Sequence, residues 1–96
     1  MTSRLARGDY AIQILGISKT TSWQDLKDWA RKAGSSVVFG DIVRENNRMY
    51  GLIEYKYRED YDNALETLHQ TELHSKTVYV YEVTSSKMHQ IQDSFK

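Results

Sequence analysis

The densest run of side chains able to do chemistry is Ser22-Trp23-Gln24-Asp25-Leu26-Lys27-Asp28. An indole ring can stack on a nucleic-acid base, while amide and carboxylate groups can hydrogen-bond to base edges. An aspartate suits guanine, because its two oxygens can accept from the N1–H and N2–H₂ groups. Lys27 and Arg31 can contact phosphates or guanine acceptors. These residue types favour contact with single-stranded nucleic acid.

The same residues also have purely structural interpretations. Trp23 can close the junction between a loop and a helix as a partly buried side chain. The Asp25 carboxylate can cap the helix together with Ser22, because these residues have the spacing of a capping box. Capping and base contact compete for the carboxylate, although its two oxygens can be divided between them.

A helix must position this run. Ser22 is the predicted N-cap, and Gly34 lies where a helix commonly stops. Residues at helical spacing predict a buried stripe, formed by Leu26, Trp29, Ala30 and Ala33. On the helical wheel the solvent side then carries Gln24, Lys27, Asp28 and Arg31, and Trp23 falls on the rim.

The remaining periodicity predicts four strands and a second helix. The strands are expected at residues 10–17, 37–44, 49–57 and 77–83, and the second helix at 58–70. This order, β-α-β-β-α-β, indicates an α+β fold of the split βαβ type. Such a fold has a four-stranded antiparallel sheet with two helices on one face. The domain is expected at residues 10–84.

Two short segments flank this predicted domain. Residues 1–9 are expected to be a flexible N-terminal segment, and residues 85–96 a C-terminal tail. In the tail, Met88, Ile91 and Phe95 recur at the spacing of a short helix.

Composition limits the function classes. A chain of 96 residues with 40% hydrophobic and 27% charged residues is expected to form one folded domain. With no cysteine it has neither a disulfide nor a thiolate zinc site. No apolar run predicts a membrane span or a signal peptide, so an intracellular location is expected. Thirteen basic and thirteen acidic residues give a net charge of zero, which is unusual for a nucleic-acid binder.

No catalytic or metal-binding arrangement is visible. His69, His74 and His89 lack metal-ligand spacing and are expected on solvated surface. No nucleophile–base pair, phosphate-binding glycine loop or carboxylate dyad can be placed. We therefore expect neither enzymatic activity nor a cofactor or metal.

The run Ser22–Asp28 resembles, letter for letter, the signature of the second RNA-recognition motif of SR proteins, the divergent "pseudo" kind. The resemblance extends back to Ile12 and forward through Tyr50-Gly51-Leu52-Ile53-Glu54-Tyr55 to Val80, about 70 of the 96 residues.

The resemblance implies a particular way of binding RNA. Ordinary motifs stack bases on aromatic residues of the first and third strands, whereas the pseudo kind binds a GGA-like purine motif through the first helix. This sequence departs from the ordinary pattern at the matching places: Gln13 and Leu52 replace aromatic residues, Met49 replaces glycine, and Tyr50 retains an aromatic. The implied RNA-binding residues are Ser22, Trp23, Gln24, Asp25, Lys27, Asp28, Arg31, Phe39 and Gly40.

Phe39 and Gly40 match an aromatic–small pair that lies beside the first helix in that family. A small residue there would let a base approach the backbone. Alternatively, Phe39 belongs to the core and Gly40 marks a β-bulge. The sequence leaves both interpretations open.

The sheet face opposite the helices is a second candidate surface. Alternation places there Leu15, Arg48, Tyr50, Leu52, Tyr79 and Tyr81, if Val78 and Val80 point to the core. This apolar patch could bind RNA, dock a protein, or be covered by the tail. The secondary RNA-contact candidates are Gln13, Arg48, Tyr50, Tyr79 and Tyr81.

The leading functional interpretation is a monomeric module that binds purine-rich single-stranded RNA, within an SR-type splicing or mRNA-processing factor. The resemblance implies residence in the nucleus, with shuttling to the cytoplasm left open. The alternative is a protein-interaction module, in which the first helix or the tyrosine-bearing sheet engages an SR-protein kinase or a splicing factor. No membrane partner is expected.

Overall fold

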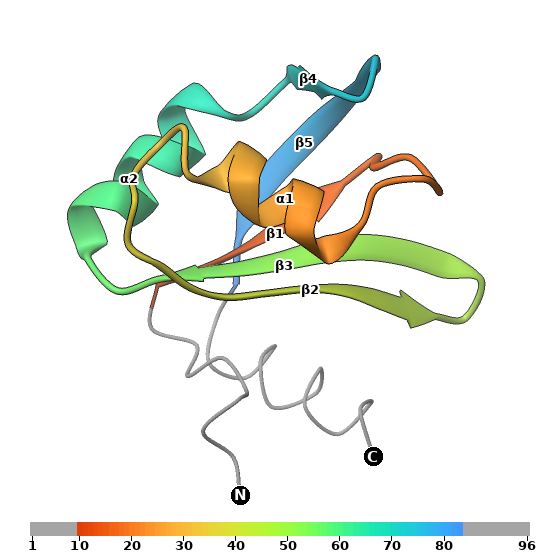
Figure 1. Cartoon of the computed structure of the whole chain (residues 1–96), viewed down its shortest axis with the longest axis horizontal. Coiled ribbons are helices and arrows are strands. Elements are labelled where there is room, and N and C mark those ends of the chain that lie inside the picture. The colour runs from red at the N-terminus through yellow and green to blue at the C-terminus, as the bar shows by residue number, and fades with distance from the viewer. Residues whose placement is uncertain (1–9, 84–96) are drawn as a thin grey trace, which may run out of the picture.

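A computed structural model describes residues 10–83 of the chain (Figure 1). Its elements in order are β1 (Ala11–Leu15), α1 (Trp23–Ala30), β2 (Val37–Glu45), β3 (Arg48–Tyr55), α2 (Arg58–Thr67), β4 (Thr71–Leu73) and β5 (Lys76–Glu82). The predicted α+β fold is confirmed. The predictions for residues 1–9 and 85–96, including Met88, His89, Ile91 and Phe95, lie outside the described residues.

The sheet has five antiparallel strands in the order β2-β3-β1-β5-β4, one more than the sequence predicted. The added strand, β4, has only three residues, and it pairs with β5 through a tight turn at His74 and Ser75. Both turn residues have positive φ, 53° and 66°. A strand this short shows no alternation, and the turn has no glycine or asparagine to mark it, so the sequence pattern did not reveal this hairpin.

Both helices pack on one face of the sheet, as predicted. The core between the two layers joins residues of β1, α1, β3, α2 and β5, among them Ile12, Leu26, Trp29, Ile53, Ala64 and Val78. The predicted stripe of α1 is buried throughout, with exposed fractions of 7% or less. Val78 and Val80 also point into this core, which confirms the register expected for β5.

Helix α1 begins as predicted and ends earlier. Ser22 has an extended backbone, its Oγ accepts from the Asp25 N–H at 3.1 Å, and its own N–H donates to Asp25 Oδ2 at 3.3 Å. This capping box satisfies two backbone N–H groups that the helix itself cannot use. After Ala30, the N–H groups of Lys32 and Ala33 donate three residues back instead of four, so the last turn tightens.

A second group of buried side chains lies on the sheet face opposite the helices. It comprises Ala11, Val43, Tyr50, Leu52 and Val83, with Leu15 and Phe39 packed against it. Leu52 is fully buried and Tyr50 is 8% exposed, whereas Tyr79 and Tyr81 are 38% and 47% exposed. Of the aromatic residues predicted on this face, only those of β5 are therefore solvent-accessible.

Three connections gather at one end of the sheet, on the right in Figure 1. Since β1 runs antiparallel to both β3 and β5, the end of β1 lies beside the starts of β3 and β5. The β1–α1 connection, the β2–β3 turn and the β4–β5 turn therefore meet there, and we call this the hairpin end. Helix α2 begins at the opposite end. Neither described helix is long and apolar enough to cross a membrane.

Candidate nucleic-acid interface

Trp23 is the first residue of α1, and its side chain is exposed at the hairpin end. It retains 46% of its accessible surface, although it directly follows a capped helix start. The Lys27 ammonium, one turn further along the helix, lies 5.5 Å from the centre of the indole ring. A cation over an exposed ring contributes about 0.5–1 kcal/mol. The exposed fraction agrees with a partly buried Trp23 at the loop–helix junction, and it also leaves ring surface accessible to a ligand.

Gly40 explains why Lys27 can take this position. A Cβ at Gly40 would collide with the Cγ atom of Lys27, so the lysine stem lies directly over the glycine backbone. A β-bulge is present as well, between Val37 and Phe39. The small residue therefore accommodates a side chain of α1, which then holds the ammonium over Trp23.

Phe39 lies on the other face of β2 from this group, whereas the resemblance implied that it lies beside the first helix. It pairs with Glu54 across β2 and β3 and packs against the cluster on the face opposite the helices. Successive strand residues point to opposite faces, so Gly40 faces α1 and Phe39 faces away. The resemblance implied that the two residues act as a pair, but neighbours in a strand point to opposite faces.

The two oxygens of the Asp25 carboxylate differ in their contacts with the protein. Its described contacts all fall on Oδ2, which accepts from the Ser22 N–H at 3.3 Å and lies 3.8 Å from His74 Nε2. The side chain is about half exposed, at 44%. Helix capping therefore occupies one oxygen and leaves Oδ1 without a described protein partner.

His74 is a member of this site that sequence reasoning missed. It lies in the β4–β5 turn, where its Nδ1 is 3.2 Å from the Thr21 hydroxyl, while its Nε2 faces Asp25. The turn therefore packs against the start of α1. Because the β4–β5 hairpin was not predicted, nothing in the sequence connected residue 74 with residues 21–25.

Three further predicted residues lie on the solvent side of α1. Gln24 is exposed with no described hydrogen bond of its side chain. Asp28 and Arg31 form an ion pair at 2.8 Å, with 78% and 43% of their side chains exposed. Such a solvated pair contributes little to stability, so either partner is available to a ligand.

The residues of the sheet that were predicted as secondary RNA contacts do not form one continuous surface. Gln13 is half-buried, and Tyr50 is buried; its burial, and secondly the charge of Glu45, raise the pKa of the Tyr50 hydroxyl. Tyr79 and Tyr81 form an exposed aromatic group with His69, whose ring lies edge-on to both at 5.9 and 5.6 Å. Arg48 lies at the hairpin end instead.

His69 corrects the expectation of a solvated surface histidine. Its ring is half-buried, and its Nδ1 accepts a hydrogen bond from the Val80 N–H at 3.0 Å. Among the residues from 10 to 83, no group of histidine, aspartate and glutamate side chains could hold a metal ion.

The chain belongs to the RNA recognition motif family, which it matches over residues 12–79. A domain of this family is a binding module rather than an enzyme, as the sequence predicted. The match covers both helices and the main strands of the sheet, and thus the positions that organise Trp23 and Lys27.

The relatives that the chain resembles are SR splicing factors, as the sequence resemblance predicted. It is 38% identical over 66 residues to serine/arginine-rich splicing factor SR30 of Arabidopsis thaliana, covering 69% of this chain and 24% of the relative. It is 36% identical over 69 residues to human serine/arginine-rich splicing factor 9, covering 72% and 29%. The chain thus spans about a quarter of the length of these curated relatives.

Solved structures show the same fold. The third RNA recognition motif of Mip6 superposes with a TM-score of 0.71 over 82% of this chain and 96% of that domain, at 18% identity. At this identity the likeness establishes the fold alone.

Proposed function

We propose that this domain binds single-stranded RNA, with preference for a GGA-like purine motif, through the beginning of α1. The observation that carries the proposal is the exposed Trp23 ring, 46% accessible, held at a capped helix start beside Lys27. A large apolar ring kept in solvent at a rigid position is suited to stacking on a base, which is worth about 1–3 kcal/mol per base.

The neighbouring groups supply the means to recognise guanine. Asp25 Oδ1 and the Gln24 amide can bond to the Watson–Crick edge of a base stacked on Trp23. Lys27 and Arg31 supply positive charge for phosphates or for guanine acceptors. In this arrangement Ser22 fixes the helix start and Gly40 fixes the Lys27 stem, so both act by positioning.

The sheet face is the weaker alternative for base stacking. Tyr50 and Leu52 are buried, and Gln13 has no ring. The exposed rings of Tyr79 and Tyr81 lie on β5, on the face opposite α1, and are proposed as secondary contacts only.

We also propose the cellular setting. The relatives' names are those of splicing factors, so the domain is expected to serve as one module of an SR-type splicing or mRNA-processing factor in the nucleus. One small module binds modestly, and a tethered neighbour would supply further affinity. We expect the domain to be monomeric and to engage protein partners through other faces.

The test is an NMR titration of the domain with a short GGA-containing RNA and a pyrimidine control. Shifts concentrated on residues 22–28 and at Gly40 are expected with the purine RNA. Trp23→Ala should weaken binding about 5- to 150-fold while the protein stays folded.

Tyr57→Ala is the matched control. Tyr57 is also an exposed aromatic, 57% accessible, with the Lys56 ammonium 5.5 Å from its ring centre, but it lies at the opposite end of the sheet. Equal losses from both variants would contradict helix-1 recognition. Shifts confined to Gln13, Tyr79 and Tyr81 would identify the sheet as the reader. No shifts at all would favour the protein-interaction module.

A further inference from the structure

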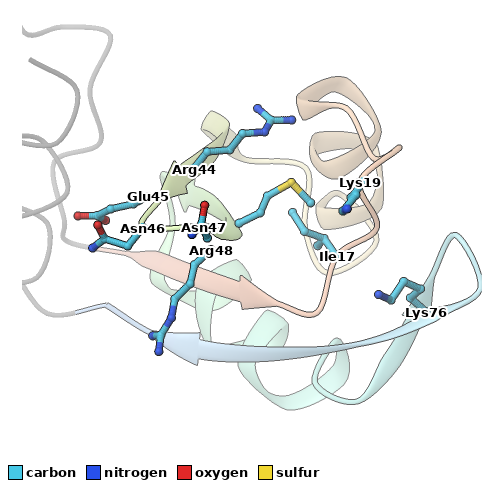
Figure 2. A pocket seen from close by; sticks show the side chains of 9 residues that line it. Ile17, Lys19, Arg44, Glu45, Asn46, Asn47, Arg48 and Lys76 are labelled. Carbon is cyan, nitrogen blue, oxygen red and sulfur yellow. The ribbon is translucent and has the colours of Figure 1, made fainter.

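A cavity of about 670 Å³ opens at the hairpin end, beside the start of α1. Its walls come from the β1–α1 connection, the β2–β3 turn and the start of β5. The lining includes four basic side chains, Lys19, Arg44, Arg48 and Lys76, and one carboxylate, Glu45. Figure 2 shows Lys19 and Lys76 on one side and the residues of the β2–β3 turn on the other. We call this the basic cleft.

The basic cleft concentrates charge in a chain whose net charge is zero. All four cations are exposed, and the ion pairs described for residues 10–83 involve none of them. Four carboxylates gather on α2 instead, in a cavity lined by Glu59, Asp60, Asp62 and Glu66 with Arg58. With four cations and the one carboxylate of Glu45, the lining of the cleft carries a net positive charge.

The basic cleft and the α1 site are adjacent. Lys19 precedes Trp23 by four residues, so their Cα atoms are at most about 14 Å apart even if the chain is fully extended. The β4–β5 turn also lies next to both sites. His74 in this turn contacts Thr21 and Asp25, and Lys76, two residues later, lines the cleft.

We propose that the basic cleft binds the phosphates of nucleotides that flank the purine motif, so that one RNA strand contacts both Trp23 and the cleft. This inference rests on the RNA binding proposed above for α1. The chemistry fits a nucleic-acid backbone because the cleft offers several separated cations, with Ile17 and Met49 as apolar floor. It adds a sequence-independent contact to the base-reading contacts of α1.

The experiment compares two double variants of the whole chain. Lys19→Gln with Lys76→Gln removes two charges from the cleft, and Lys32→Gln with Lys56→Gln removes two equally exposed lysines elsewhere. Affinity is measured between about 50 and 200 mM salt for a minimal GGA RNA and for RNAs extended on the 5′ or the 3′ side.

The cleft variant should bind one of the extended RNAs about tenfold more weakly at low salt, and its dependence of log Kd on log salt should fall by about 1.4, as two lost phosphate contacts predict. Binding of the minimal RNA and the control variant should change little. Equal effects of the two double variants would overturn the inference while leaving the α1 proposal intact.

The two proposals fail in different ways. If Trp23→Ala leaves RNA affinity unchanged but the cleft variant still lowers it, recognition by α1 is wrong and the basic cleft remains an RNA-binding site. If a poly-aspartate peptide competes as well as an RNA of equal charge, the cleft is a site for an acidic protein segment, and the inference is wrong.

Discussion

The starts of helices α1 and α2 both carry an exposed aromatic residue, but in different surroundings. Trp23 is the first residue of α1 and Tyr57 is the N-cap of α2, and in each case a lysine ammonium lies 5.5 Å from the ring centre. Helix α1 has a complete capping box, whereas the N-cap of α2, Tyr57, makes no side-chain hydrogen bond to the helix. The two aromatic–lysine pairs therefore differ in the capping of the helix that carries them and in the charges around them.

The charges reinforce this difference. The first turn of α2 carries Glu59 and Asp60, which favour the helix electrostatically but repel phosphate. The start of α1 adjoins the basic cleft. The two helix starts are thus similar in local composition, and we expect only the start of α1 to attract phosphate.

The largest expected difference is in the stability that a leucine of each helix contributes. Leu26 of α1 is fully buried, and its side chain lies so close to Gly51 that a Cβ there would be 2.6 Å from Leu26 Cδ2. Leu26→Ala should lower the free energy of unfolding by about 2–5 kcal/mol. The half-buried Leu65 of α2 should cost about 1–2 kcal/mol when changed to alanine. Urea denaturation of both variants measures the two values, and equal values would contradict the stronger anchoring of α1.

The tyrosines near each helix predict a difference at alkaline pH. Tyr55 donates a buried hydrogen bond to the Ala30 carbonyl at 2.6 Å, and burial, with the charge of Asp60 second, raises the pKa of its hydroxyl far above 10. The folded state therefore holds this proton more tightly than the unfolded state. The resulting stability is fully present below about pH 10 and is lost as the pH rises further.

Tyr55→Phe should cost about 1–2 kcal/mol at neutral pH and make the stability curve flatter above pH 10. Tyr61 on α2 is the comparison, because its hydroxyl is 3.4 Å from Glu82 in an exposed contact. Tyr61→Phe should have the smaller effect in both respects. Thermal unfolding from pH 7 to 11 measures both, and identical pH profiles of Tyr55→Phe and the wild type would disprove the role of the Tyr55 proton.

The caps predict effects of opposite sign. Ser22→Ala removes the acceptor for the Asp25 N–H and should destabilise the protein by about 1 kcal/mol. Tyr57→Ser places a capping hydroxyl at the uncapped start of α2 and should stabilise it by about 0.5 kcal/mol. Chemical denaturation of the two variants and their combination provides the measurement. A destabilised Tyr57→Ser protein would mean that the contact of Tyr57 with Lys56 matters more than the missing cap.

The start and the buried face of α1 could be predicted from the sequence, because they depend on residues close together in the chain. The capping box of Ser22 and Asp25 and the stripe from Leu26 to Ala33 depend on residues three or four positions apart, and both are confirmed. Local spacing fixes a helix start and its buried face without any knowledge of the rest of the fold.

The features that the sequence did not reveal are long-range. Phe39 packs against residues of β1 and β3 on the sheet face away from α1, and the unpredicted β4–β5 turn brings His74 to Asp25. The basic cleft assembles cations from positions 19, 44, 48 and 76, which no window of the sequence contains together. The equal numbers of acidic and basic residues gave no indication that these basic side chains gather at one end of the fold.

The smallest expected effects come from the surface ion pairs of the two helices. Asp28 and Arg31 of α1 are 2.8 Å apart, and Arg58 and Asp62 of α2 are 3.5 Å apart. Asp28→Asn and Asp62→Asn should each change the free energy of unfolding by no more than about 0.5 kcal/mol, because exposed pairs gain little over hydration. Stability measured in low and in high salt checks this value.

The Asp28→Asn and Asp62→Asn variants should differ in their affinity for RNA. If Arg31 contacts phosphate, Asp28→Asn frees it from its partner and should tighten binding slightly at low salt. If Asp28 itself contacts a base, the same change should weaken binding at every salt concentration. Asp62→Asn, on the acidic helix, should leave purine recognition unchanged; a change in base preference there would mean that α2 also contacts the bases, and the contrast between the two helix starts would not hold.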